Sequence, residues 1–228
     1  MNQPKLYARL RWRLAQYLEG RWWQRYLRRK DPDAYLAEKQ AYWHRTLAEL
    51  DWELQPGRQV LDAGCGPAGV FIIAHEVEQV TALDPLLPQY DCTLPIFSQS
   101  TYPTIDFCSQ PLETPIPKAP IFEAIYCFNA INHVSNWELA LDRLTSYAAP
   151  ETRMILTSDV HRHSVLLPIF KTLPGDALHP QQHSATNYRQ ALEHRGWVID
   201  RQVELRREFI FSYTAWVCTY QPEPAKAN

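Results

Sequence analysis

The sequence predicts an α/β fold, a Rossmann-like doubly wound sheet that is mostly parallel and that follows a pair of N-terminal helices. Two observations lead to this prediction. From about residue 57 onward, short apolar strands alternate with helix-like stretches, and the first strand runs into a glycine-rich loop. The chain of 228 residues is 46% hydrophobic with a net charge of −2. These values suit one core of about 150 to 250 residues and exclude a mostly disordered chain.

Residues 1–50 are expected to form a helical extension that covers the active site. Apolar residues recur at helical spacing in its first part, and Gly20 is a candidate position for a bend. Asp31 and Pro32 then predict the N-cap and first turn of a second helix that runs to about Leu50.

The first 30 residues are strongly basic. They carry nine Lys and Arg against one acid, Glu19, for a net charge of +8. Solvation of the helix, or docking on an acidic surface, would explain this charge. Trp12, Trp22 and Trp23 among the arginines instead favour contact with a membrane surface or an anionic substrate.

Nothing in the sequence predicts a membrane span, a secretory signal or a disulfide. No apolar run approaches the roughly 20 residues that a bilayer requires, and arginines interrupt the N-terminal segment. Five widely spaced cysteines without a Cys-x-x-Cys pair are expected to be free thiols, most of them buried. We therefore expect a cytoplasmic protein, with peripheral membrane contact through residues 1–30 as a further possibility.

The glycines are few and concentrated. Three of the seven fall between residues 64 and 69, where a backbone with positive φ or a close approach to the main chain would require them. A strand over residues 59–61 precedes this loop, and a helix over residues 70–76 follows it. A strand, a glycine loop and a helix N-terminus together predict a site for a polar ligand that bears a nucleoside.

The spacing Gly64-x-Gly66-x-x-Gly69 also matches the dinucleotide fingerprint, so a nicotinamide-dependent oxidoreductase stays open as an alternative. Asp62 distinguishes the two ligands. Its charge would repel the pyrophosphate of NAD, whereas it would favour a ligand with a cationic, methionine-like end.

The run Val60 to Gly69 resembles the first motif of the class I S-adenosylmethionine-dependent methyltransferases, which reads apolar, apolar, acid, apolar, Gly-x-Gly-x-Gly. Ala68 stands at the third glycine, and Gly69 follows it. The resemblance covers roughly residues 57–158. It implies S-adenosylmethionine as the cofactor, S-adenosylhomocysteine as the product and an antiparallel last strand. The cofactor residues that it implies in this run are Asp62, Gly64, Cys65 and Gly66.

A second strand over residues 77–83 ends at Asp84, whose carboxylate can accept hydrogen bonds from both hydroxyls of a ribose. The resemblance places the ribose-binding acid at this point, with Pro85 beside it.

A third strand, over residues 104–108, precedes the residues that the resemblance assigns to the adenine. They are Gln110 and Leu112, with Glu113 as the alternative to Gln110. Eight prolines between residues 84 and 120 predict an irregular loop with at most one helical turn.

A fourth strand over residues 122–128 continues into Asn129 and His133, which the resemblance places at the floor of the active site. Asn129 is expected to contact the cofactor. His133 is the candidate general base because imidazole titrates near neutrality, and the alternative is that it only supports the loop. A helix over residues 137–149, capped by Ser135 or Asn136, and a strand over residues 153–157 come next.

Residues 159–184 are expected to form an insertion that covers the substrate, because they follow a strand at its carboxyl end. They hold four candidate substrate residues, His161, His163, His179 and His183. No metal is expected, since no Cys or carboxylate completes a ligand spacing. A helix over residues 185–195, capped by Ser184, and strands over residues 197–205 and 208–220 close a domain that spans residues 51–222. Residues 223–228 are expected to be a disordered tail.

The sequence therefore predicts an S-adenosylmethionine-dependent methyltransferase that acts at an oxygen of a small or lipid-like acceptor. No Asn-Pro-Pro-Tyr type of tetrapeptide follows the fourth strand, which disfavours a DNA adenine or a protein glutamine as the substrate. Besides the oxidoreductase, a non-catalytic module that binds a nucleoside or a membrane surface remains an alternative. The oligomeric state is not predicted.

Overall fold

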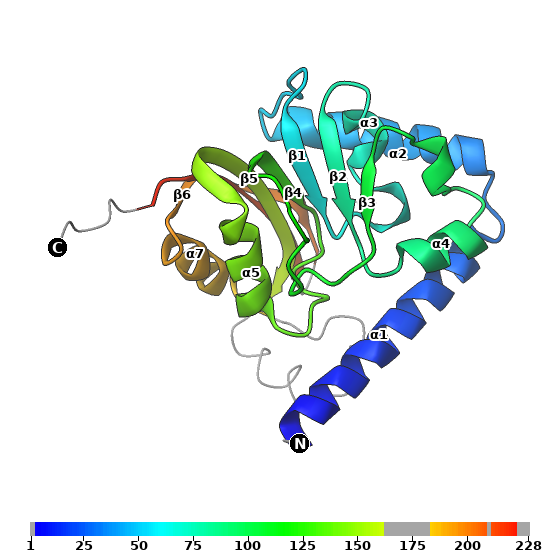
Figure 1. The fold of residues 1–228 in the computed structure, drawn as a ribbon, viewed down its shortest axis with the longest axis horizontal. Helices are drawn as coiled ribbons and strands as arrows, with labels where there is room; N and C mark the ends of the chain where they lie inside the picture. The colour runs from blue at the N-terminus through cyan, green and yellow to red at the C-terminus, as the bar shows by residue number, and fades with distance from the viewer. Residues whose placement is uncertain (1–2, 162–182, 209–210, 223–228) are drawn as a thin grey trace.

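A single seven-stranded sheet organises the chain, in a computed structural model that describes residues 3–161, 183–208 and 211–222 (Figure 1). The strand order is β3-β2-β1-β4-β5-β7-β6. The strands are β1 (Gln59–Ala63), β2 (Gln79–Leu83), β3 (Asp106–Cys108), β4 (Phe122–Cys127), β5 (Ala148–His161), β6 (Trp197–Arg207) and β7 (Phe211–Tyr220). β1 to β5 are parallel to one another, and β7 runs antiparallel to both β5 and β6. The predicted Rossmann-like fold with antiparallel strands at its end is confirmed.

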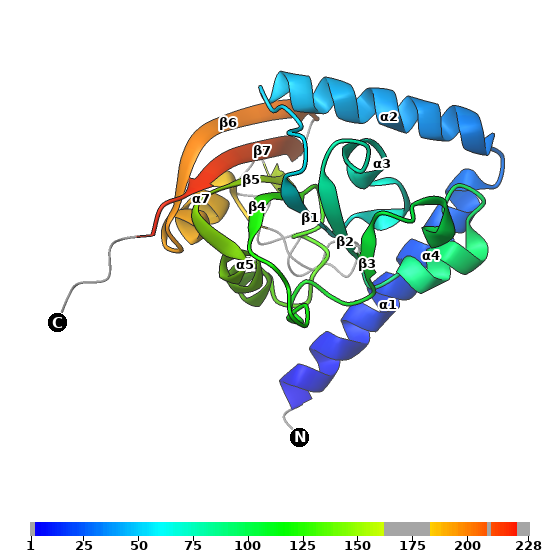
Figure 2. The ribbon, with the colours of Figure 1, turned by 45° about the horizontal axis from the view of Figure 1, so that its top comes forward.

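Helices cover both faces of the sheet. Figure 2 shows α2 (Pro32–Glu49) and α3 (Phe71–Ala74) on one side and α5 (Trp137–Ser146) and α7 (Ala185–Glu193) on the other. Successive residues of β1 point into two different clusters, since Val60 packs with α2 and α3 while Leu61 packs with α5 and α7. Because both faces are buried, the central strands are almost wholly apolar, as parallel strands between helix layers require.

The N-terminal helices form as predicted, except at the proposed bend. Asp31 caps α2, and its Oδ1 accepts a hydrogen bond from the backbone N–H of Ala34 at 2.8 Å. α1 (Gln3–Leu27) continues through Gly20 without a break, so the prediction of a bend there was wrong. Gly20 instead allows close packing, because a Cβ at this position would overlap the side chain of Gln89.

The proline-rich segment is more helical than predicted. α4 (Leu87–Thr93) is a seven-residue helix, and a 3₁₀ turn follows over Gln99–Thr101. Pro88 lies in the first turn of α4, where the N–H that proline lacks would have had no partner within the helix. In contrast, α3 is shorter than the predicted helix over residues 70–76, because the chain turns back through the bond from the N–H of Val77 to the carbonyl of Ala74.

The order of the strands determines where a ligand can bind. β1 and β4 are neighbours in the centre of the sheet, and the chain leaves them toward opposite sides. In open α/β sheets, ligands bind outside the carboxyl ends of the strands at such a point. Among the described residues, no helix is long and apolar enough to cross a membrane.

Candidate active site

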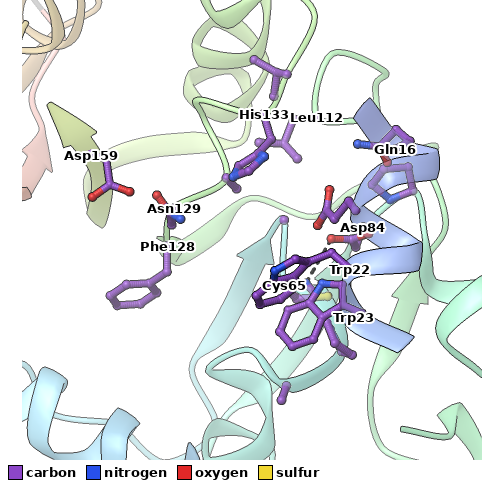
Figure 3. Close-up of a pocket in the computed structure, with 18 of the residues that line it drawn as sticks. Gln16, Trp22, Trp23, Cys65, Asp84, Leu112, Phe128, Asn129, His133 and Asp159 are labelled. Atoms are coloured by element: carbon purple, nitrogen blue, oxygen red, sulfur yellow. Dashed lines mark hydrogen bonds between the residues drawn. The ribbon is translucent and has the colours of Figure 1, made fainter. Parts of the chain in front are cut away.

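A cavity of about 520 Å³ lies at the carboxyl ends of β1, β2 and β4 (Figure 3). The loop after β1, the residues that follow β2 and β4, and side chains of α1, α2 and the far strands line it. Its size is within the range of small-molecule and cofactor sites.

The glycine loop forms one wall of the cavity for the backbone reasons that the sequence suggested. Gly64 and Gly66 have φ of +74° and +58°. A Cβ at Gly64 would overlap that of Ala130, whereas a Cβ at Gly66 would meet nothing within 4 Å. The loop therefore packs tightly at its first glycine and leaves open space at its second. Cys65 lies between them and also lines the cavity.

Asp62 lies behind this wall, not in it. Its side chain is buried at 1% exposure, and its Oδ2 accepts a hydrogen bond from the backbone N–H of Phe71 at 2.9 Å. The absence of a Cβ at Gly69 permits this contact, since that atom would lie 2.6 Å from the same oxygen. Asp62 is not among the residues that line the cavity, and its carboxylate holds the start of α3, so direct contact with a ligand stays a prediction.

Asp84 forms part of the wall, as predicted for the ribose-binding acid. Its Oδ2 accepts a hydrogen bond from the backbone N–H of Gly66 at 3.0 Å, and its Oδ1 accepts one from Leu86 at 2.8 Å. A carboxylate has about four acceptor positions, so each oxygen of Asp84 retains one for a ligand.

The two acids share a buried environment, which shifts their titration. Burial raises the pKa of Asp84 to about 6, and the bonds from Leu86 and Gly66 only partly oppose the shift. Burial also raises the pKa of Asp62 to about 7, with a contribution from the charge of Asp84.

Four other predicted residues, Pro85, Leu112, Asn129 and His133, line the cavity, but Gln110 does not. The side-chain N–H of Gln110 donates to the carbonyl of Thr114 at 3.3 Å. Glu113, the alternative to Gln110, does line the cavity.

Glu113 also fixes the start of α5. Its Oε1 accepts bonds from the backbone and hydroxyl of Ser135 and from the backbone of Asn136. Asn136 is the N-cap of the helix, because its Oδ1 accepts a bond from the backbone N–H of Leu139 at 3.2 Å. The Oε2 atom of Glu113 is buried without a hydrogen-bond partner in the described structure.

The end of β4 carries a strained residue at the floor of the cavity. Asn129 has a φ of +50°, which is uncommon for a residue with a side chain. Its backbone N–H donates to Oγ1 of Thr157 at 2.8 Å, and that oxygen lies 2.7 Å from the hydroxyl of Tyr213. Strained residues of this kind cluster at functional sites. Figure 3 shows Asn129, His133 and Asp159 around the same open space.

The predicted histidine cluster is largely outside the described residues. His163 and His179 are not described, and His161 is described only as the end of β5. His183 stacks on Trp137 with a centroid distance of 3.9 Å and is not among the residues that line the cavity. In the described ranges, no three His, Cys, Asp or Glu side chains gather as a metal site would require.

Sequence reasoning missed most of the aromatic side chains that line the cavity, which we call the aromatic wall. It consists of Trp22, Trp23, Tyr42, Trp43, Phe128 and Tyr213. Trp43 joins the two walls, because its Nε1–H donates to the carbonyl of Ala68 at 3.0 Å and its ring lies 4.8 Å from that of Phe128. No local pattern could have identified Tyr213, which reaches the cavity only through the antiparallel pairing of β7 with β5.

The described lining carries more acids than bases. The acids are Glu19, Asp84, Glu113 and Asp159, and the bases are Lys39 and Arg206. Burial lowers the pKa of Lys39, whose ammonium lies 4.8 Å from the centre of the Tyr42 ring. Lys39 makes no ion pair with a carboxylate in the part of the chain that the structure describes. The described lining therefore presents more acidic than basic side chains to a ligand.

A comparison with protein families identifies the domain. A family model described as a methyltransferase domain matches residues 35–202, which is most of the chain. The chain belongs to this methyltransferase family. The resemblance that the glycine loop suggested is thus confirmed, and the matched region contains every cofactor residue that it implied. No curated protein matches the chain in sequence.

Several solved structures share the fold of this domain at low sequence identity. YcgJ from Bacillus subtilis has a TM-score of 0.63 and 13% identity, over 78% of this chain and 100% of its own. Magnesium protoporphyrin IX methyltransferase from Synechocystis, with bound S-adenosylhomocysteine, has a TM-score of 0.52 and 20% identity, over 81% and 83%. The 1,6-didemethyltoxoflavin-N1-methyltransferase of Burkholderia thailandensis has a TM-score of 0.58 and 15% identity, over 97% and 92%.

Proposed function

We propose that this methyltransferase transfers a methyl group from S-adenosylmethionine to a hydroxyl oxygen of a small or lipid-like acceptor. One observation carries the proposal: the cavity at the switch point of the sheet is bounded by the open side of Gly66 and by the carboxylate of Asp84. The solved structures that contain S-adenosylhomocysteine support the choice of cofactor.

The residues of this chain fit that cofactor. Asp84 retains two acceptor positions for the ribose hydroxyls, and Pro85 and Leu112 offer apolar contacts for an adenine. The excess of carboxylates suits a donor with a sulfonium and an ammonium group, and Lys39 and Arg206 can receive its single carboxylate. When bound, the cofactor supplies an electrophilic methyl group, and the chain aligns the partners and excludes water.

The same geometry disfavours a nicotinamide dinucleotide. In dinucleotide-binding folds the pyrophosphate lies on the N–H groups at the start of the helix that follows the glycine loop. Here the N–H of Phe71, the first residue of α3, already donates to the buried carboxylate of Asp62. The carboxylates of Asp84 and Glu113, which line the cavity, would add to the repulsion of a pyrophosphate.

The aromatic wall supports the acceptor class. Trp43, Phe128 and Tyr213 present large apolar surfaces beside the end of β4, where a planar or hydrocarbon-rich acceptor would be buried. A hydroxyl acceptor must lose its proton as the methyl group is transferred. His133 and Asp159 lie on the same side of the cavity and are our candidates to receive it.

Calorimetry with S-adenosylhomocysteine tests the cofactor assignment. Asp84→Ala should weaken binding at least about tenfold, because the ribose loses two hydrogen bonds to a charged group. Asp106→Ala, a change at an exposed acid of β3 outside the cavity, is the matched control. Unchanged affinity in Asp84→Ala would reject the ribose assignment.

Consumption of S-adenosylmethionine with a panel of phenols, hydroxylated acids and lipid alcohols tests the acceptor class. His133→Gln should lower kcat about 10²-fold or more while the affinity for S-adenosylhomocysteine is retained. If turnover is unchanged in this variant, a group other than His133 receives the proton of the acceptor hydroxyl. Methyl transfer confined to nitrogen or carbon acceptors would reject the oxygen proposal.

A further inference from the structure

α1 exposes an unusual number of large apolar side chains. Of the eight that are exposed among the described residues, five lie in this one helix: Leu14, Tyr17, Leu18, Trp22 and Tyr26. Leu14, Leu18, Trp22 and Tyr26 follow one another at intervals of four residues, so they form a stripe along one side of the helix. We call these four residues the α1 stripe, and its members are 36–52% exposed.

The opposite side of α1 accounts for its attachment to the protein. Leu27 is buried, Gly20 packs on α4, and Trp23 makes an edge contact with Tyr90 at 6.5 Å. Figures 1 and 2 both show α1 passing α4 and extending beyond the sheet toward its N-terminus. The helix is thus held on this side near its C-terminal end. Within the α1 stripe, Tyr26 also makes an edge contact with Tyr35 of α2 at 6.2 Å, whereas Leu14, Leu18 and Trp22 are 36–52% exposed.

The cations beside the stripe form no ion pair within the described part of the chain. Arg21, Arg25, Arg28 and Arg29 are all exposed, and none pairs with a carboxylate in the described part of the chain. Arg21 and Lys30 donate instead to the hydroxyls of Tyr17 and Tyr26. These four arginines are therefore not docked on acidic side chains of the described residues.

We propose that the α1 stripe and its flanking arginines form a docking surface for an anionic lipid bilayer. Leucines with a tryptophan and a tyrosine are the side chains that enter the boundary between headgroups and acyl chains, and arginines beside them pair with anionic headgroups. A second copy of the chain is a poorer occupant, since the arginines of two such helices would repel each other. A nucleic acid would match the arginines but leave Leu14 and Leu18 exposed.

One residue belongs both to this surface and to the cavity. Trp22 is 47% exposed as a member of the α1 stripe, and it also lines the cavity. A docked protein would therefore present the wall of its cavity to the membrane boundary. This step rests on the proposed function, and it identifies the acceptor as an amphiphile that is taken from the bilayer.

Sedimentation of the full chain with vesicles tests the docking surface without any reaction. Binding to phosphatidylcholine vesicles that contain phosphatidylglycerol should be at least about tenfold tighter than binding to phosphatidylcholine alone, and high salt should weaken it. The variant Leu14→Ser with Leu18→Ser should lose most of this binding, as should Arg21→Gln with Arg25→Gln and Arg28→Gln. The control variant Ile121→Ser with Val198→Ser removes two apolar side chains that are equally exposed elsewhere, and it should bind like the wild type.

Each variant is also measured for binding of S-adenosylhomocysteine. None of the altered residues lines the cavity, so retained binding shows that the variant is folded and keeps the test separate from the proposed function. The proposal is overturned if the wild type does not sediment with anionic vesicles, or if both α1 variants sediment like the control. It is also overturned if the α1 variants instead abolish a dimer, or if duplex DNA binds as tightly as the vesicles do.

Discussion

At the scale of single residues, the proposed role of Asp84 in binding the cofactor predicts a characteristic pH dependence. Burial raises its pKa to about 6 in the free protein. Both ribose hydroxyls can donate to it only when it is ionised, because protonation turns one of its acceptor positions into a donor. Below that pH, binding must first remove a proton. We therefore expect the affinity for S-adenosylhomocysteine to fall up to about tenfold per pH unit below pH 6 and to change less above pH 7.

Calorimetry between pH 5 and pH 8, values that bracket the raised pKa, measures this dependence. Asp84→Asn cannot titrate, so its weaker binding should vary less with pH. The stability of the free protein should respond in the opposite direction. A native carboxyl group with a raised pKa binds more protons than the unfolded chain does, so its contribution to stability declines as the pH rises from about 4 toward 6. Equal pH profiles for wild type and Asp84→Asn would contradict the assignment.

The glycine loop allows a second test with a matched control. Gly64 and Gly57 share a φ of +74°, but only Gly64 has another residue where its Cβ would be. Gly57→Ala should cost about 1 to 2 kcal/mol of unfolding free energy from the backbone alone. Gly64→Ala should cost about 1 to 3 kcal/mol more, because Ala130 must move. Urea denaturation measures both, and equal losses would show that the contact with Ala130 is unimportant.

At the scale of whole elements, α2 is joined to the glycine loop by one side chain. The indole N–H of Trp43 donates to the carbonyl of Ala68. Elsewhere, the indole of Trp52 donates to the hydroxyl of Tyr126 at 3.1 Å, in a buried place outside the cavity. Trp43→Phe and Trp52→Phe should each lower the unfolding free energy by about 1 to 3 kcal/mol through a lost buried hydrogen bond.

Only Trp43→Phe should also weaken the binding of S-adenosylhomocysteine, by about fivefold or more, because it releases the loop from α2. Denaturation and calorimetry on the two variants separate the effects. If both variants bind equally well, α2 covers the site without positioning the loop.

At the scale of the whole molecule, binding of the correct cofactor should raise the unfolding free energy of the protein. A ligand at one hundred times its Kd adds about 2.7 kcal/mol of unfolding free energy. For a chain of this size that is a rise in Tm of about 5 to 10 °C. S-adenosylhomocysteine should produce such a rise in a thermal-shift assay, and NADH at the same concentration should not. A rise with NADH alone would restore the oxidoreductase alternative.

Much of this organisation could be predicted because its signals are local. The run Val60 to Gly69 contains both the end of a strand and the glycines of the loop that follows it. Asp84 comes directly after the next apolar strand. Likewise, Asp31 and Pro32 mark the start of α2. The two wrong predictions concern residues that are compatible with more than one local structure. Pro88 was counted as a helix breaker although the first turn of a helix accepts it, and Gly20 was taken for a bend although it permits close packing of α4.

The sequence by itself determined the order of the strands and helices, the glycine loop and the acid at position 84, because each depends on a few neighbouring residues. Only the tertiary structure decided which side chains share the cavity. Asp62 went behind the wall because Gly69 brings the start of α3 onto its carboxylate. Tyr213 entered the cavity because β7 pairs with β5 in one register. Contacts of this kind join residues that are distant in the chain, so they are set by packing and not by local pattern.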